Sequence, residues 1–253
     1  MTRLSAEALA GLAEVRPGDD LAGMIANAAA GAGTEIGAGD VVAVAQKVVS
    51  KAEGRLRDLR EVRPSAEASD LGTRLGKDAR LVQVILDEST AILRSEHGVL
   101  IVRTTHGLVC ANAGVDQSNV PGEEMVALLP ADPDDSARAL RAALAERLGV
   151  RPAVVICDSF GRAWRLGQAD VAIGCAGLAP LDDLRGGPDA EGRELTAAID
   201  AVADQVASAA ALVRSKAGRE AVVIVRGLDR HVTLEDGPGA AAIIRPETED
   251  LFT

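Results

Sequence analysis

Two aspartates stand where apolar segments give way to polar residues, a position at which carboxylates could hold a cation. The apolar run at 108–110 is followed by Gly114 and then Asp116, and the run at 154–156 leads through Cys157 into Asp158. Ligand sites in sheet proteins favour the carboxyl ends of strands. Magnesium and manganese commonly take one or two carboxylates, with phosphate oxygens and water as further ligands. Asp116, Asp158 and the Ser159 hydroxyl therefore form a candidate metal site that would handle phosphates. The alternative is that each aspartate only caps a turn.

Basic side chains near these segments could bind the anionic part of a substrate. Arg162 and Arg165 follow Asp158 within one turn of chain and could clamp a phosphate or a carboxylate through bidentate hydrogen bonds. Lys47 and Lys51 are four residues apart and share one face of their segment. For both pairs, the alternative is a solvated pair of charges.

Other patterns resemble functional sites but have simpler explanations. The sequence GAGTEIG at 31–37 has the wrong spacing for a dinucleotide fingerprint and precedes a strand, so we expect a loop. No GxxxxGK[ST] loop occurs. Asp132, Asp134 and Asp135 are explained by helix capping, and the three histidines have no ligand spacing.

Composition excludes several classes of protein. The net charge of −11 argues against binding to nucleic acid, which requires a basic surface. No apolar run approaches the roughly 18 residues of a membrane span, and the N-terminus lacks the pattern of a secretory signal. We therefore expect a cytoplasmic protein. The three cysteines form no CxxC pair and are expected to be buried thiols.

The elements that must position these residues follow from hydrophobic periodicity. We expect helices over 21–30, 66–76, 80–89 and from Asp132 to about 148, a hairpin formed by 99–103 and 107–110, and buried strands at 41–45, 154–156 and 222–225. Leu195, Ile199, Val202, Val206 and Val213 recur at helical spacing. Strands and helices do not alternate strictly, which favours a mixed α+β fold. Residues 1–253 would form one unit, or two closely packed lobes.

Several motifs, kept in order along nearly the whole chain, resemble those of the coenzyme F420-0:L-glutamate ligase family, also called F420 gamma-glutamyl ligases. They are RPGDD at 16–20, QKVVSKAEGR at 46–55, NAGVDQSNVPG at 112–122, DSFGRAWRLGQAD at 158–170, DLRG at 183–186 and RPETEDLF at 245–252. Each motif is weak alone, and together they are specific.

The resemblance implies a ligase that uses GTP and magnesium or manganese to add glutamate to F420-0, with further glutamates joined by gamma linkages. It also implies an intertwined homodimer of an unusual α+β fold, and it allows a monovalent cation as a further cofactor. By position, the resemblance assigns metal binding to Asp116 and Asp158, with Ser159 on a second metal. The GTP contacts that it implies are Leu12, Ala13, Glu14, Val15, Gln46, Lys51 and Asn119. Catalytic roles for Lys51, Arg162 and Arg165 are our inference from charge and placement.

The chain departs from the family pattern at several positions. An acidic metal ligand that some members carry after the long helix is replaced here by Ser215-Lys216, which would weaken the second metal or substitute the lysine charge for it. Ile199-Asp200 stands in place of a common Thr-Glu pair, and Gln46 in place of a serine. Some relatives have an added C-terminal flavin-binding domain. The sequence given ends at Thr253, so we expect any associated reduction to need a separate protein.

Two other functions remain open at this point. One is a metal-dependent nucleotide phosphotransferase or hydrolase with a different acceptor. The other is a GTP-binding protein without turnover. Production of GDP and of a glutamylated product distinguishes the three.

Overall fold

A five-stranded sheet lies at the centre of the fold, in the computed structural model that describes residues 3–215, 218 and 220–250. Its strand order is β1-β12-β2-β8-β9, and β2 runs parallel to β8 while the other neighbours are antiparallel. The strands are β1 (Ser5–Ala8), β12 (Val222–Arg226), β2 (Val41–Ala45), β8 (Ala153–Arg162) and β9 (Arg165–Ala176). The predicted buried strands at 41–45, 154–156 and 222–225 are therefore confirmed.

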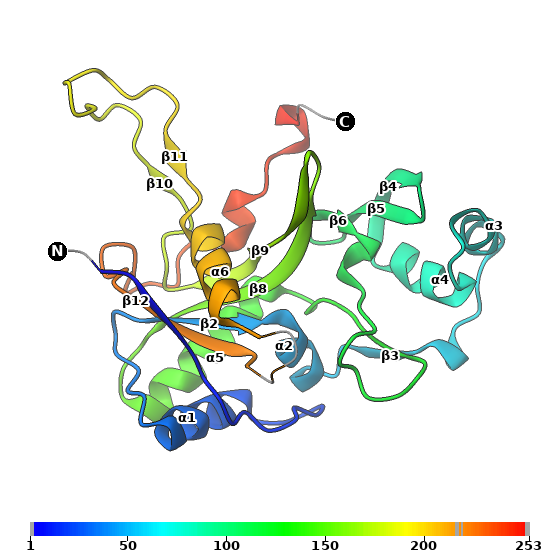
Figure 1. Ribbon diagram of the computed structural model, residues 1–253, viewed down its shortest axis with the longest axis horizontal. Coiled ribbons are helices and arrows are strands. Elements are labelled where there is room, and N and C mark those ends of the chain that lie inside the picture. The colour runs from blue at the N-terminus through cyan, green and yellow to red at the C-terminus, as the bar shows by residue number, and fades with distance from the viewer. Residues whose placement is uncertain (1–2, 216–217, 219, 251–253) are drawn as a thin grey trace.

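Helices cover both faces of this sheet, as Figure 1 shows. Val42 and Val44 point into one hydrophobic cluster, and Val41 and Ala43 point into another on the opposite face. Burial on both faces explains why these strands are continuously apolar. The first face is covered by α1 (Leu21–Ala32), α2 (Gln46–Ala52) and α5 (Pro133–Leu148), and the second by α6 (Val202–Val213) and the 3-10 helix η3 (Ala240–Ile243).

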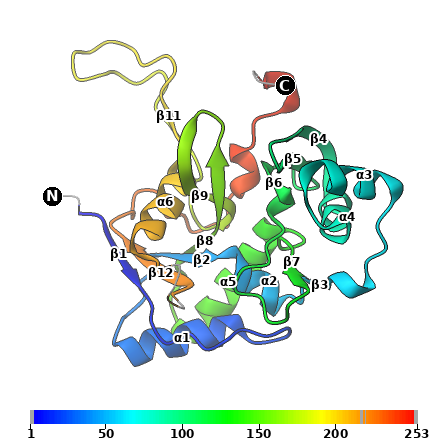
Figure 2. The same ribbon diagram turned by 45° about the vertical axis from the view of Figure 1, so that its right-hand side comes forward.

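A third hydrophobic cluster is built from residues between Leu59 and Leu128. In Figure 2 the elements of this segment lie together beside the large sheet. They are β3 (Leu56–Asp58) paired with β7 (Met125–Ala127), the sheet of β4 (Ser89–Glu96), β5 (Val99–Thr104) and β6 (Val109–Ala111), the helices α3 (Ala66–Leu75) and α4 (Ala79–Asp87), and the 3-10 turns η1 (Leu59–Glu61) and η2 (Asn112–Gly114). The hairpin around 104–106 and the mixed α+β class are confirmed. A division into two lobes stays a prediction.

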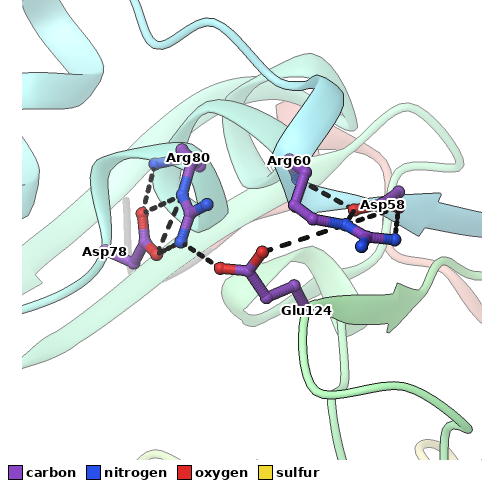
Figure 3. A network of polar contacts seen from close by, with 5 residues as sticks. All are labelled: Asp58, Arg60, Asp78, Arg80 and Glu124. Atoms are coloured by element: carbon purple, nitrogen blue, oxygen red, sulfur yellow. Dashed lines mark hydrogen bonds and ion pairs between the residues drawn. The ribbon is translucent and has the colours of Figure 1, made fainter.

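Charged side chains connect β3, η1 and α4 within the segment 56–128 (Figure 3). Arg60 pairs with Asp58 at 2.5 Å and Arg80 pairs with Asp78 at 2.6 Å. Glu124 lies between the two arginines, 2.9 Å from Arg80 and 3.9 Å from Arg60. The Arg60 hydrogen bonds lower the pKa of Asp58 to about 2. The network lies at the surface, where ion pairs contribute little stability, and through Glu124 it connects the residue before β7 to η1 and α4.

The residues before α6 contradict the prediction of a long helical stripe. Leu195 and Ile199 belong to a projecting arm in which β10 (Asp182–Asp183) pairs with β11 (Ile199–Asp200) (Figure 1). Backbone hydrogen bonds across this arm, such as Leu195 N–H to the Gly187 carbonyl at 2.8 Å, replace the helical ones. Val202 and Val206 do lie on α6 and are buried. Helical spacing alone did not distinguish the arm from the helix.

Helix caps agree with the sequence, with one addition. Asp20 caps α1 and Asp132 caps α5, where its carboxylate accepts the Asp135 N–H at 2.9 Å. Asp134 is not only part of a cap, because its buried carboxylate accepts the N–H groups of Cys175 and Ala240 at 2.8 and 2.7 Å. It thereby ties α5 to β9 and η3. A short turn, η4 (Glu247–Glu249), lies near the end of the described chain.

In the part of the chain that the structure describes, no helix combines the length and the apolarity that a membrane crossing requires. Cys110, Cys157 and Cys175 are buried and unpaired, as expected.

Candidate functional site

Asp158 and Ser159 lie within a long strand, not at its end. We expected Asp158 at the last step of a short strand, and this is wrong: β8 continues to Arg162 and pairs with β9 as a hairpin. The apolar pattern stops before the strand does, because the outer part of the hairpin extends beyond the helices that cover the sheet. The antiparallel register places Asp158 opposite Val171 and Ser159 opposite Asp170.

Asp116 reaches the site through a left-handed turn. Asn112, Ala113 and Gly114 have φ values of 54°, 54° and 70°. A Cβ atom on Gly114 would lie 2.7 Å from a Leu129 methyl carbon, so this position needs glycine both for its backbone and for the close approach. After the turn, the Asp116 N–H donates to the Ala127 carbonyl at 3.0 Å and its carbonyl accepts from Ala127 at 2.9 Å. The backbone that carries this carboxylate is therefore fixed.

Lys47, in the first turn of α2, binds the Asp116 loop. Its Nζ donates to Asp116 Oδ2 at 2.7 Å, to the Ser118 carbonyl at 2.5 Å and to Ser118 Oγ at 2.8 Å. The Lys47 side chain is only 18% exposed. Although burial alone would raise the pKa of Asp116, hydrogen bonds from Lys47 and Ser118 hold this pKa below its ordinary value. Asp116 is thus ionised with an internal counter-ion.

The structure brings Asp158 within electrostatic range of Asp116. Burial is the main cause that raises the pKa of Asp158 to about 7; the negative charges of Asp116 and Asp170 act in the same direction, and the Ser159 N–H and Lys47 oppose them. Asp116 and Asp170 each have a basic partner, whereas Asp158 has no ion-pair partner among the described residues. An unpaired carboxylate beside two others is a site where an added cation would be stabilised.

The protein side chains alone do not complete the coordination shell of a metal ion. Within the described ranges, no three histidine, cysteine, aspartate or glutamate side chains gather closely enough to hold a metal by themselves. The two carboxylates, Asp116 and Asp158, leave positions that phosphate oxygens and water would fill, which is the usual composition of a magnesium site. The donor set fits such an ion.

Lys51 and the segment 12–15 meet beside α2. Lys51 Nζ donates to Glu14 Oε1 at 2.5 Å, and the Lys51 side chain is only 7% exposed. Leu12 and Val15 are buried in the core, so a ligand at this segment would meet its backbone, Ala13 or Glu14 instead of the two apolar side chains.

Gln46 and Asn119, two further residues that the resemblance assigns to GTP, differ in their surroundings. Gln46 is buried and accepts a hydrogen bond from Ser50 Oγ at 2.8 Å. Asn119 is exposed, with a φ of 54°.

Arg162 and Arg165 are not brought to the aspartates as the sequence suggested. They pair across the outer end of the β8–β9 hairpin and are exposed, and Arg162 Nη2 donates to the Leu166 carbonyl at 2.9 Å. At about 3.3 Å per strand residue, Arg162 lies roughly 13 Å along β8 from Asp158. A single helical turn would have kept them close, and a strand does not.

Sequence reasoning missed two charged residues next to Ser159. Asp170 accepts hydrogen bonds from Ser159 Oγ and from Arg214 Nη1. Predicting the β8–β9 hairpin would have revealed Asp170, because it is the cross-strand neighbour of Ser159. Arg214 follows α6 and has no sequence signal of its own. The substitution at Lys216 and the final Phe252 of the terminal motif lie outside the described residues.

Comparison with known proteins matches a family described as F420-0:Gamma-glutamyl ligase over residues 11–227. The chain is 48% identical to the coenzyme F420:L-glutamate ligase of Methanopyrus kandleri, over 94% of this chain and 93% of the relative. It is 42% identical to the ligase of the same name from Methanothermobacter thermautotrophicus, over 96% of both chains. A third relative of that name, from Haloarcula marismortui, is 40% identical over 96% of this chain and 93% of its own length.

Proposed function

The chain belongs to the F420-0:gamma-glutamyl ligase family, and we propose that it joins L-glutamate to coenzyme F420-0 in F420 biosynthesis and then adds further gamma-linked glutamates. The observation that carries this proposal is the family match over residues 11–227, which spans the segments of Lys51, Asp116 and Asp158. Relatives alignable over more than nine-tenths of both chains bear the name of such a ligase.

Amide formation in water needs an activated carboxyl group. A carboxylate does not condense with an amine by itself, because an oxygen must leave. We propose that the carboxylate takes the γ-phosphoryl group of GTP, giving GDP and an acyl phosphate. The amine of glutamate then attacks the acyl carbon, the C–O bond to phosphate breaks, and the amine loses a proton. The products are the amide, GDP and inorganic phosphate. Such catalysis depends mainly on positioning and on neutralisation of charge.

Asp116 and Asp158 would hold magnesium or manganese in this proposal, with Ser159 on a second cation. A surplus of negative charge supports this assignment, because Asp158 lacks an ion-pair partner among the described residues and lies near Asp116 and Asp170. A divalent cation bound there would neutralise charge on the triphosphate during phosphoryl transfer. Asp116 Oδ2 is held by Lys47, so this lysine would shift or share the carboxylate when the site is loaded.

Lys51 is the basic group that we assign to the phosphates. Its ammonium lies at the end of a nearly buried side chain, beside the segment 12–15 that is proposed to meet the nucleotide. Gln46 lies five residues before Lys51 on α2, and Asn119 follows the Asp116 loop. Roles for Arg162 and Arg165 would require substrate or a second chain to reach the outer end of the β8–β9 hairpin.

The first test is an assay with GTP, magnesium, L-glutamate and F420-0. We expect GDP only when both co-substrates are present, together with a product that is heavier by one or more glutamyl residues in mass spectrometry. GDP without a glutamylated product would instead support the phosphotransferase or hydrolase. Tight GTP binding without GDP would support a non-catalytic protein.

We also propose a homodimer that uses the projecting parts of the chain. Trp164 is 74% and Leu166 is 99% exposed at the tip of the β8–β9 hairpin, and Ile199 on the projecting arm is 41% exposed. Exposed apolar side chains on arms that reach away from the body are typical of interfaces. Light scattering should give about 52 kDa, twice the chain mass of 26.0 kDa. The double substitution Trp164→Asp and Leu166→Asp should give monomers, whereas Leu212→Asp, on exposed α6 surface, should not. A dimer that survives the double substitution would contradict a role for the hairpin.

A further inference from the structure

Ser159 belongs to a partly buried chain of hydrogen bonds that runs from β8 to the end of α6. Ser159 Oγ donates to Asp170 Oδ1 at 2.5 Å, and Arg214 Nη1 donates to Asp170 Oδ2 at 2.9 Å. The backbone carbonyl of Asp170 accepts from Ser208 Oγ at 2.8 Å. Asp170 of β9 thus links β8 to α6 and to Arg214 at the end of that helix.

Asp170 is placed to orient other groups, and it does not face a ligand. It is 7% exposed, and each of its two carboxylate oxygens has a hydrogen-bond donor. Arg214 is 13% exposed in its side chain, and its Nε and Nη2 atoms are buried without hydrogen-bond partners in the described part of the chain. Asp170 therefore supplies the counter-charge for this arginine, while the arginine fixes the position of the carboxylate.

The Asp170 bond decides what the Ser159 hydroxyl can do. A serine hydroxyl has one proton to donate and two lone pairs that accept. Since the proton is committed to Asp170, only lone pairs remain for a ligand. Such an oxygen can contact a cation or a donor, and it cannot donate to a phosphate.

We propose that Asp170, fixed by Arg214, is a positioning residue that holds Ser159 as a ligand for a divalent cation. This inference rests on the proposed metal site at Asp116, Asp158 and Ser159. Partners behind metal ligands orient those ligands and increase their basicity, and their loss typically costs 10–100-fold in metal affinity. Arg214 would prevent Asp170 itself from becoming a competing ligand, because its second oxygen is already occupied.

The test measures Mn²⁺ affinity of the full, metal-stripped chain by the loss of the free-ion signal in electron paramagnetic resonance. Asp170→Asn should weaken Mn²⁺ binding by roughly 10–100-fold, and Ser159→Ala should weaken it as well. The double variant, Asp170→Asn with Ser159→Ala, should bind Mn²⁺ with the affinity of whichever single variant binds more weakly, because Asp170 acts through Ser159. A merely structural role would not produce this non-additivity.

Asp204→Asn is the matched control. Asp204 also ties β9 to α6, by accepting the Ala172 N–H at 2.9 Å, but it does not contact Ser159. It should leave Mn²⁺ affinity unchanged. Should Asp170→Asn fail to fold, Asp170→Asn combined with Arg214→Gln removes both buried charges together, and the same loss of affinity is expected.

The outcomes separate the two proposals. Weakening by Ser159→Ala but not by Asp170→Asn, or fully additive losses, would overturn the positioning role and leave the metal site intact. Absence of Mn²⁺ binding by the unchanged chain, or no effect of Ser159→Ala, would overturn the role of Ser159 in the proposed metal site and the positioning role with it.

Discussion

Asp158→Asn should reduce glutamate ligation by roughly 10³-fold and, at the same time, stabilise the metal-free chain. The loss of activity follows from the removal of a proposed metal ligand, since metal-ion catalysis contributes several kcal/mol and each 1.36 kcal/mol is tenfold in rate. The gain in stability follows from the removal of a carboxylate that burial and two neighbouring aspartates oppose in its charged form. Opposite effects on activity and stability are expected where a residue serves function.

The stability gain should depend on pH with a defined sign. The folded pKa of Asp158, about 7, is raised from an ordinary value of 3.8. Below about pH 4 this carboxyl is protonated in both the folded and the unfolded chain, so it does not change the free energy of unfolding. Between about pH 4 and 7 the unfolded chain releases the proton while the folded chain retains it, so the folded state loses stability as pH rises, and the cost is complete above pH 7. A shift of this size corresponds to about 2–4 kcal/mol after allowance for relaxation.

Urea denaturation in the presence of a chelator measures this effect. The Asp158→Asn variant and the unchanged chain should have similar unfolding free energies at pH 4.5 and should diverge by about 2–4 kcal/mol at pH 8. Asp204→Asn removes another carboxylate whose pKa is raised by burial, outside the proposed metal ligands, and it should retain ligase activity. If Asp158→Asn brought no gain between pH 4.5 and pH 8, Asp158 would carry no unfavourable charge in the folded state.

The fold could be predicted where one physical signal dominates. The run at 41–45 is apolar at every position because both faces of β2 are buried, and Asp20 marks the start of α1 because its carboxylate accepts the Gly23 N–H at 3.0 Å. β9 was not predicted, because its exposed outer third, from Arg165 to Gln168, lacks an alternating pattern. β4 was not predicted either; it begins at Ser89, the last residue of the helix predicted over 80–89.

The candidate site could be predicted residue by residue but not as an assembly. The sequence placed Asp116 and Asp158 after apolar segments, and the structure brings them within electrostatic range. The sequence could not show that Lys47 donates a hydrogen bond to Asp116, or that Ser159 donates one to Asp170. Both contacts depend on how separate segments pack together. Spacing within a segment also misled us at Arg162, since a helical turn and a strand place the fourth residue at different distances.

Lys51→Met should lower kcat by roughly 10²–10³-fold and weaken GTP binding. The Lys51 ammonium has little exposure and is held at 2.5 Å from Glu14, beside the segment proposed to meet the nucleotide. Loss of one pre-positioned donor to a developing charge typically costs this much. Lys51→Arg should restore little, because a planar guanidinium does not fit the place of a compact ammonium in a nearly buried site.

The Glu14→Gln variant tests whether Lys51 acts on the phosphates or only forms an ion pair with Glu14. If Glu14 only holds Lys51 until the triphosphate arrives, the Glu14→Gln variant frees the ammonium and should bind GTP as tightly as the unchanged chain, or more tightly. Steady-state kinetics with varied GTP, together with nucleotide binding by calorimetry, measures both variants. If Lys51→Met retained full activity, or if Glu14→Gln lost as much as Lys51→Met, the lysine would be a structural counter-ion of Glu14 and the phosphates would have to be neutralised elsewhere. The exposures of the pair favour a role for Lys51 at the phosphates: the lysine is 7% exposed and fixed in place, while Glu14 is 39% exposed and can be replaced by a triphosphate as the counter-charge.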